Sequence, residues 1–94
     1  MERYEIGSFV FSKAGHDIGT IYLIIDKSAG RLILADGKQK TQENPKVKNI
    51  KHVSWINYCD EALKKKLEAK QKVTDEEIKY AIKCYKHTKI LEEV

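Results

Sequence analysis

The chain has 94 residues, a length that suits one small domain or a small domain with an appendage. Hydrophobic residues make up 41% of it and charged residues 34%, which excludes wholesale disorder. The formal net charge is +4, and the apolar runs are too short to span a membrane.

The first part of the chain is predicted to be β-structure. Residues 8–12 and 20–26 are runs of β-branched and aromatic residues, as in strands, and a loop with two glycines separates them. A second glycine-containing turn precedes a third strand at residues 31–35. The Asp36-Gly37 pair predicts a two-residue turn that returns residues 38–40 along that strand.

A fifth strand is expected at residues 47–56, after the only proline of the chain. Five short strands joined by tight turns predict a small closed antiparallel barrel of the Src-homology-3-like size, because closure removes exposed sheet edges. A flat open meander is the alternative arrangement.

The rest of the chain is predicted to be helical. The first helix is expected to begin at Asn57, with two acids in its first turn. Thr74 and Glu77 have the spacing of a capping box, and Val73 and Ile78 flank them at the positions of a hydrophobic staple. We therefore expect a C-terminal helical hairpin that packs on the barrel, and an α+β fold.

Cys59 and Cys84 do not form a Cys-x-x-Cys pair, so the sequence contains no zinc pattern. We expect free buried thiols in a reducing cytosol. The first five residues lack the basic and then apolar layout of a signal peptide. These features favour a cytoplasmic protein without a metal or other cofactor.

Residues 7–26, GSFVFSKAGHDIGTIYLIID, resemble the KOW motif, in which two strands flank a short glycine-containing loop. Gly19 stands in the place of the characteristic glycine. The continuation LADGK at residues 34–38 and PKVKNIKHV at residues 45–53 is similar to short bacterial KOW-domain proteins. These are related to a large-subunit ribosomal protein of archaea and eukaryotes.

The resemblance covers about the first 55 residues. It implies a KOW-type barrel over residues 1–56 and a helical extension over residues 57–94, packed together as a single structural unit. It also implies an RNA-binding protein, ribosomal or ribosome-associated, that contacts structured RNA such as ribosomal RNA. Because other KOW domains bind proteins, the alternative is an interaction module that docks on a ribosomal protein or RNA polymerase.

The charge of the chain is concentrated in residues 38–51, which contain five lysines and one acid, a net charge of +4. Such a local field attracts polyanions, although lysines also keep small proteins soluble. Lysines in alternate positions of an extended strand share one face, so we expect one basic stripe. The expected RNA-binding residues are Lys13, Gly15, His16 and Gly19 of the glycine loop and Lys38, Lys40, Lys46, Lys48 and Lys51 of the basic segment.

Lys79, Lys83 and Lys86 share one face of the second helix. We interpret this face as a solvated surface, with a second RNA contact as the alternative. No catalytic residues are expected, because the three histidines lie far apart and no nucleophile or carboxylate accompanies them in a recognisable motif. A small-molecule substrate is not expected either.

Overall fold

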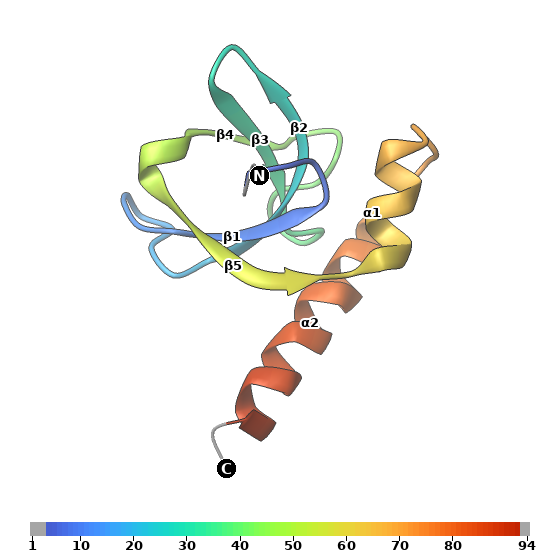
Figure 1. Cartoon of the computed structure of the whole chain (residues 1–94). Coiled ribbons are helices and arrows are strands. Elements are labelled where there is room, and N and C mark those ends of the chain that lie inside the picture. The colour runs from blue at the N-terminus through green and yellow to red at the C-terminus, as the bar shows by residue number, and fades with distance from the viewer. Residues whose placement is uncertain (1–3, 93–94) are drawn as a thin grey trace.

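The computed structural model describes residues 4–92 and has an antiparallel sheet with two helices beside it (Figure 1). The strands β1 (Ser8–Ser12), β2 (Ile21–Ser28), β3 (Arg31–Ala35), β4 (Lys46–Asn49) and β5 (Val53–Cys59) form one sheet in the order β4-β3-β2-β1-β5. A 3-10 helix, η1 (Ile50–His52), joins β4 to β5, and α1 (Glu61–Glu68) and α2 (Asp75–Glu92) follow. The predicted α+β class, with five antiparallel strands and two C-terminal helices, is confirmed. The ends of the predicted segments 1–56 and 57–94, residues 1–3 and 93–94, lie outside the described residues.

The predicted strand at residues 38–40 is wrong, because this segment is part of a loop that joins β3 to β4. The side chain of Asp36 organises the loop: its Oδ1 accepts hydrogen bonds from the backbone N–H groups of Lys38 and Lys40, each at 2.9 Å. The backbone N–H groups of Asp36 and Gly37 in turn donate to the carbonyl oxygen of Lys40. Asp36-Gly37 therefore begins a longer loop and does not form a two-residue hairpin turn.

The predicted strand at residues 47–56 is divided into two strands. Asn49 caps η1, with its side-chain oxygen accepting from the backbone N–H of Lys51 at 3.1 Å, and the chain turns there. As a result β4 pairs with β3 at one edge of the sheet and β5 pairs with β1 at the other.

The predicted start of the first helix at Asn57 is also wrong, because β5 continues through Cys59 alongside β1. The helix begins at Glu61 instead. Asp60 is its N-cap, and the Asp60 side chain accepts a hydrogen bond from the backbone N–H of Leu63 at 3.1 Å.

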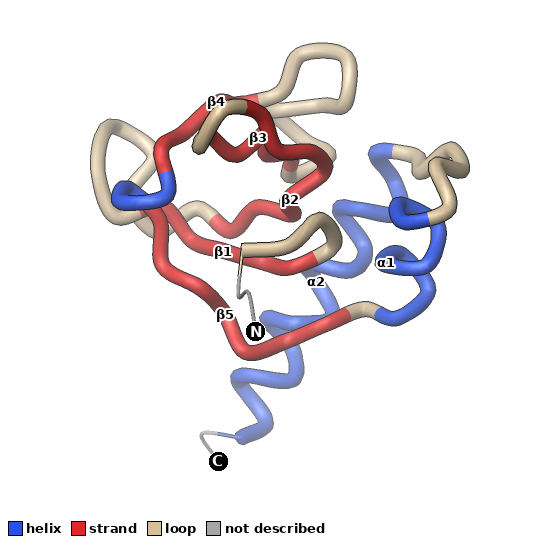
Figure 2. Tube along the Cα trace, turned by 45° about the horizontal axis from the view of Figure 1, so that its top comes forward, coloured by secondary structure: helices blue, strands red, loops and turns tan. Residues whose placement is uncertain are grey.

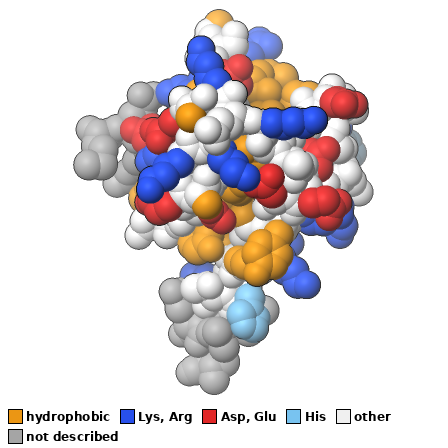
Figure 3. All heavy atoms as spheres, turned by 90° about the vertical axis from the view of Figure 1, so that its right-hand side faces the viewer, with side chains coloured by type: hydrophobic (Ala, Val, Ile, Leu, Met, Phe, Trp, Pro, Cys, Tyr) orange, Lys and Arg blue, Asp and Glu red, His pale blue; other side chains and the backbone are white. Residues whose placement is uncertain are grey.

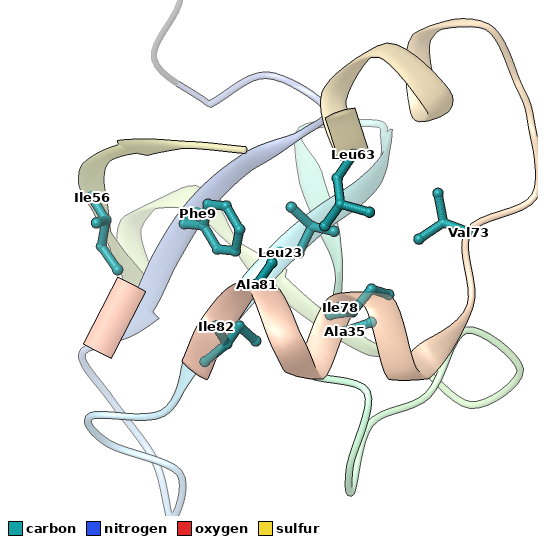
Figure 4. Close-up of a cluster of buried hydrophobic side chains, with 9 residues drawn as sticks. All are labelled: Phe9, Leu23, Ala35, Ile56, Leu63, Val73, Ile78, Ala81 and Ile82. Carbon is teal, nitrogen blue, oxygen red and sulfur yellow. The ribbon is translucent and has the colours of Figure 1, made fainter. Parts of the chain in front are cut away.

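Both faces of the sheet bury apolar side chains, since consecutive strand residues point to opposite faces. The face toward the helices contributes Phe9, Leu23, Ala35 and Ile56 to a cluster with Leu63, Val73, Ile78, Ala81 and Ile82 (Figure 4). The opposite, concave face gathers Val10, Tyr22, Ile24, Leu32, Leu34 and Val53. Both helices lie on the same side of the sheet (Figure 2).

The capping box at the start of α2 is confirmed. The backbone N–H of Glu77 donates to Thr74 Oγ1 at 3.1 Å, and the backbone N–H of Thr74 donates to Glu77 Oε1 at 3.3 Å. The two residues of the predicted staple, Val73 and Ile78, are both buried in the cluster beneath the helices.

No helix in the described part of the chain combines the length and the apolar character needed to cross a membrane. Both cysteines are free, but Cys59 is exposed and Cys84 is only half-buried, so the prediction of buried thiols is wrong.

Candidate nucleic-acid interface

The glycine loop, residues 13–19, is closed by backbone hydrogen bonds between its ends. The N–H of Gly19 donates to the carbonyl oxygen of Ser12 at 2.9 Å, and the N–H of Ser12 donates to that of Thr20 at 3.0 Å. Gly19 has φ +88°, and a Cβ built there would meet no atom within 4 Å. The backbone conformation therefore favours glycine, while the space beside Gly19 is open to a partner.

Asp17 holds this loop from within. Its Oδ1 accepts a hydrogen bond from Ser12 Oγ at 2.9 Å and lies 3.1 Å from the ammonium nitrogen of Lys48, and its Oδ2 accepts from the Tyr22 hydroxyl at 2.7 Å. Lys48 Nζ also donates to the carbonyl oxygen of Ala14 at 2.9 Å. One carboxylate thus ties the loop to β2 and to β4.

These contacts shift the pKa values of the groups concerned. Burial by itself would raise the pKa of Asp17, but the hydrogen bonds from Tyr22 and Ser12 and the charge of Lys48 outweigh it and lower the pKa to about 2. Burial, together with the neighbouring Asp17 carboxylate, raises the pKa of the Tyr22 hydroxyl well above its ordinary value. Asp17 therefore remains charged, and the network intact, throughout the neutral range.

Lys48 of β4 consequently holds the glycine loop in shape, a structural role that no pattern in the sequence predicts. Its side chain is only 9% exposed. Lys46 and Lys48 lie on one face of β4, as expected. That face is the one on which their partners on β3, Leu34 and Leu32, are buried. Val47, the apolar residue between them, is 48% exposed, so β4 reverses the usual alternation.

A first hollow, which we call the β4 hollow, has a volume of about 470 Å³. It is lined by Arg31, Lys46, Val47, Lys48, Asn49, Lys51 and His52, and none of these described residues is acidic. The backbone N–H of Lys13 donates to the carbonyl oxygen of His52 at 2.8 Å, so the glycine loop begins beside this hollow. Arg31 and His52 extend the predicted set. No local pattern places Arg31 here, because it lies on β3 and reaches the hollow through the pairing of β3 with β4.

A second hollow, the α2 groove, has a volume of about 620 Å³ and runs between the glycine loop and α2. It brings Gly19 and Lys38, both predicted, together with Lys79, Lys83 and Lys86 of α2. Ile18, Thr20, Ile21, Asp36 and Ile82 complete the lining. The predicted basic stripe is therefore divided, with Lys38 in this groove and Lys46, Lys48 and Lys51 in the β4 hollow.

A third hollow, the apolar hollow, adjoins the α2 groove and has a volume of about 400 Å³. Its lining residues are Phe11, Gly19, Ile21, Ile56, Tyr85, Lys86 and Lys89.

Of the remaining predicted residues, Gly15 and His16 are exposed in the glycine loop, and Lys40 is half-buried in the loop between β3 and β4.

The position of Lys38 opposite α2 depends on Gly37. Gly37 is buried with φ +77°, and a Cβ built there would overlap the carbonyl oxygen of Asp75 and lie 3.0 Å from the backbone nitrogen of Lys79. Only glycine permits this approach of the loop to the first turn of α2.

Gln42 also holds this loop to the start of α2: its backbone N–H donates to Asp75 Oδ1 at 3.0 Å, and its side-chain amide donates to the carbonyl oxygen of Val73.

The side of the molecule that carries α1 has acidic and basic side chains interspersed (Figure 3). Two of its lysines form ion pairs, Lys66 with Glu77 at 2.7 Å and Lys64 with Glu5 at 3.5 Å. Charges of opposite sign cancel in part on that side, whereas no acid lines the β4 hollow among the described residues and Asp17 pairs with its Lys48.

The part of the chain that the structure describes contains no group of three side chains able to hold a metal ion. No protein-family model matches the sequence, and a search of curated proteins gives no significant match.

Proposed function

We propose that this protein is a KOW-type RNA-binding protein that contacts structured RNA, ribosomal RNA above all, through the β4 hollow and without catalysis. The observation that carries the proposal is the gathering of Arg31, Lys46, Lys51 and His52 around one hollow that no described acid lines. Guanidinium and ammonium groups bind phosphates, and such contacts supply most of the affinity for a nucleic acid. A ribosomal or ribosome-associated role in the cytoplasm follows from the KOW resemblance.

The topology supports a closed barrel of the Src-homology-3-like, KOW type with a helical hairpin after it. The two edge strands, β4 and β5, are joined by the single turn η1. The register shifts between Ile24 and Asp26 and between Ser8 and Phe9, and irregularities of this kind bend strands and increase their twist. The concave face is filled by side chains from β1, β2, β3 and β5, as expected for the interior of a small barrel.

The glycine loop supports the same proposal, because its backbone is held in place before any ligand arrives. Asp17 and Lys48 fix its shape, and its exposed residues Lys13 and His16 are left to meet phosphates. Gly15 and Gly19, both exposed, let an RNA backbone come close. A preformed loop loses little conformational entropy on binding.

The second candidate function is a protein-interaction module that docks on a ribosomal protein or RNA polymerase. The observation in its favour is the apolar hollow beside Phe11. Against it, only Phe11 of the large apolar side chains exposed among the described residues lines this hollow, and the others, Ile18, Val47 and Tyr80, lie outside it. A docking surface would gather them into one patch.

The experiment that tests the proposal is sedimentation of the native protein with ribosomal subunits in sucrose gradients at low and raised salt. We expect sedimentation with the large subunit that is lost as salt rises, and a weaker association for the Lys46→Gln/Lys51→Gln variant. The matched control is Lys65→Gln/Lys72→Gln, which removes the same charge from two exposed lysines that line none of the three hollows.

Association that resists salt would favour the protein-interaction module. Absence from every ribosomal fraction would refute the ribosomal role. Equal loss of association in both double variants would refute the β4 hollow as the contact surface, since net charge alone would then explain the effect.

A further inference from the structure

The α2 groove and the apolar hollow are parts of one continuous feature, because both are lined by Gly19, Ile21 and Lys86. Lys79, Lys83, Lys86 and Lys89 of α2 follow one another along its side at intervals of three or four residues. With a rise of about 1.5 Å per residue, this row of lysines is about 15 Å long. The combined groove therefore suits an extended polyanion a few units long.

Most of these charges are available to a ligand. Lys79 is paired with Glu76 at 3.4 Å, and no ion pair within the described residues involves Lys38, Lys83, Lys86 or Lys89. Asp36 is the only acid among the described residues that line the α2 groove, and it already accepts two backbone hydrogen bonds in its own loop. Four lysines are thus free to contact phosphates.

The groove also offers apolar surface between these charges. Phe11 of β1 is 37% exposed and lines the apolar hollow, and Ile18 of the glycine loop is 68% exposed and lines the α2 groove. Tyr85, which is partly buried and also lines the apolar hollow, packs against Tyr58 with the ring centroids 5.1 Å apart and the planes tilted by 57°. Aromatic surfaces held rigidly beside lysines are what the bases of a single strand stack on.

We propose that the combined groove, between α2 and the glycine loop, is a second RNA site that takes a single strand. Its phosphates lie on Lys38, Lys83, Lys86 and Lys89, and its bases lie on Phe11 and Tyr85. A duplex cannot use the aromatic surfaces, because its bases are stacked on one another. This inference rests on the proposed RNA-binding function and adds a second surface and a second class of RNA to it.

The test is binding of a labelled ten-nucleotide uridine RNA, followed by fluorescence anisotropy between about 0.05 and 0.2 M salt. Four phosphate contacts to a single strand predict a fall in affinity of about fiftyfold over this range. For the Lys83→Gln/Lys86→Gln variant two contacts remain, and the fall is about sevenfold. The Lys65→Gln/Lys72→Gln control should behave as the native protein does.

A ten-residue abasic strand tests the stacking surface separately. It carries the same phosphates without bases, and with one base stacked on each of Phe11 and Tyr85 its affinity should be at least about thirtyfold lower than that of the uridine RNA. Equal affinity for the two strands would overturn the assignment of Phe11 and Tyr85.

The Lys83→Gln/Lys86→Gln variant must first give a native far-ultraviolet circular dichroism spectrum and unfolding midpoint. If this folded variant shows the salt dependence of the native protein, the second site is wrong. Native protein that binds ribosomal RNA but not the uridine RNA would overturn the second site alone. Native protein that binds neither RNA would overturn the proposed function itself.

Discussion

Replacement of Gly37 by alanine tests the packing of the β3–β4 loop on α2. Gly37 has φ +77°, a conformation that costs an ordinary L-residue about 1–2 kcal/mol. The added Cβ would also overlap the backbone of Asp75 and lie 3.0 Å from the backbone nitrogen of Lys79. Neither atom belongs to a flexible side chain, so the loop or the helix must move.

Overpacking of this kind costs about 1–3 kcal/mol. We therefore expect Gly37→Ala to lower the free energy of unfolding by about 2–5 kcal/mol in total. For a small domain each kcal/mol corresponds to about 4–8 °C in the melting temperature.

Gly30→Ala is the matched control. Gly30 has nearly the same φ, +79°, but a Cβ there would meet nothing within 4 Å. It should therefore lose only the conformational part, about 1–2 kcal/mol. The difference between the two variants isolates the contact between the loop and α2.

The assay is urea unfolding of both variants, followed by the fluorescence of the single tryptophan, Trp55, and by far-ultraviolet circular dichroism. A larger loss for Gly37→Ala, with an unchanged dependence on urea, is the expected result. Equal losses in the two variants would show that the contact between Gly37 and α2 contributes nothing to stability.

Three further predictions concern single contacts. The pKa of the Asp17 carboxylate falls from 3.8 to about 2 on folding. The carboxylate therefore stabilises the folded protein by about 2 kcal/mol above pH 4, and this contribution is lost as the pH falls from about 4 to 2. Asp17→Asn should remove this pH dependence of the free energy of unfolding, measured by urea unfolding at each pH. Lys48→Gln should cost about 1–3 kcal/mol, because it leaves the half-buried carboxylate without its cation. Lys46→Gln should stay within about 0.5 kcal/mol, and equal losses in the two lysine variants would contradict the role of Lys48. Thr74→Ala should cost about 1 kcal/mol through loss of the capping box, and an unchanged melting temperature would show that the cap does not contribute.

The features that the sequence predicted well are local ones. The capping box depends on Thr74 and Glu77 alone, three residues apart, and it forms as expected. Strands β1 and β3 coincide with short β-branched and aromatic or aliphatic runs bounded by turn residues. In these segments local preference and tertiary packing favour the same structure.

The secondary-structure predictions are wrong where a contact between residues far apart in the sequence determines the local structure. Residues 38–40 do not form a strand, because the Asp36 side chain accepts hydrogen bonds from the backbone N–H groups of Lys38 and Lys40. In addition, Gly37 packs on the first turn of α2, which lies nearly 40 residues further along the chain. Asn57 and Asp60 are both good N-cap residues. Because β5 stays paired with β1 as far as Cys59, the helix cannot begin at Asn57 and is capped by Asp60.

The candidate site was predictable in its residue types but not in its arrangement. Periodicity shows that Lys79, Lys83 and Lys86 share a helical face, but not that Gly19 and Lys38 lie opposite them. Likewise, no local pattern pairs Lys48 with Asp17, which lies 31 positions earlier. Such contacts follow from the order of strands and the packing of α2, which a single sequence does not specify.

The most direct test of RNA binding through the β4 hollow is the salt dependence of the affinity of the purified protein for large-subunit ribosomal RNA. A plot of log affinity against log salt should have a negative slope for the native protein. That slope should become shallower by about 1.4–1.8 in Lys46→Gln/Lys51→Gln and stay unchanged in Lys65→Gln/Lys72→Gln. A slope near zero for the native protein, or the same slope in all three proteins, would show that the β4 hollow does not bind RNA through its lysines.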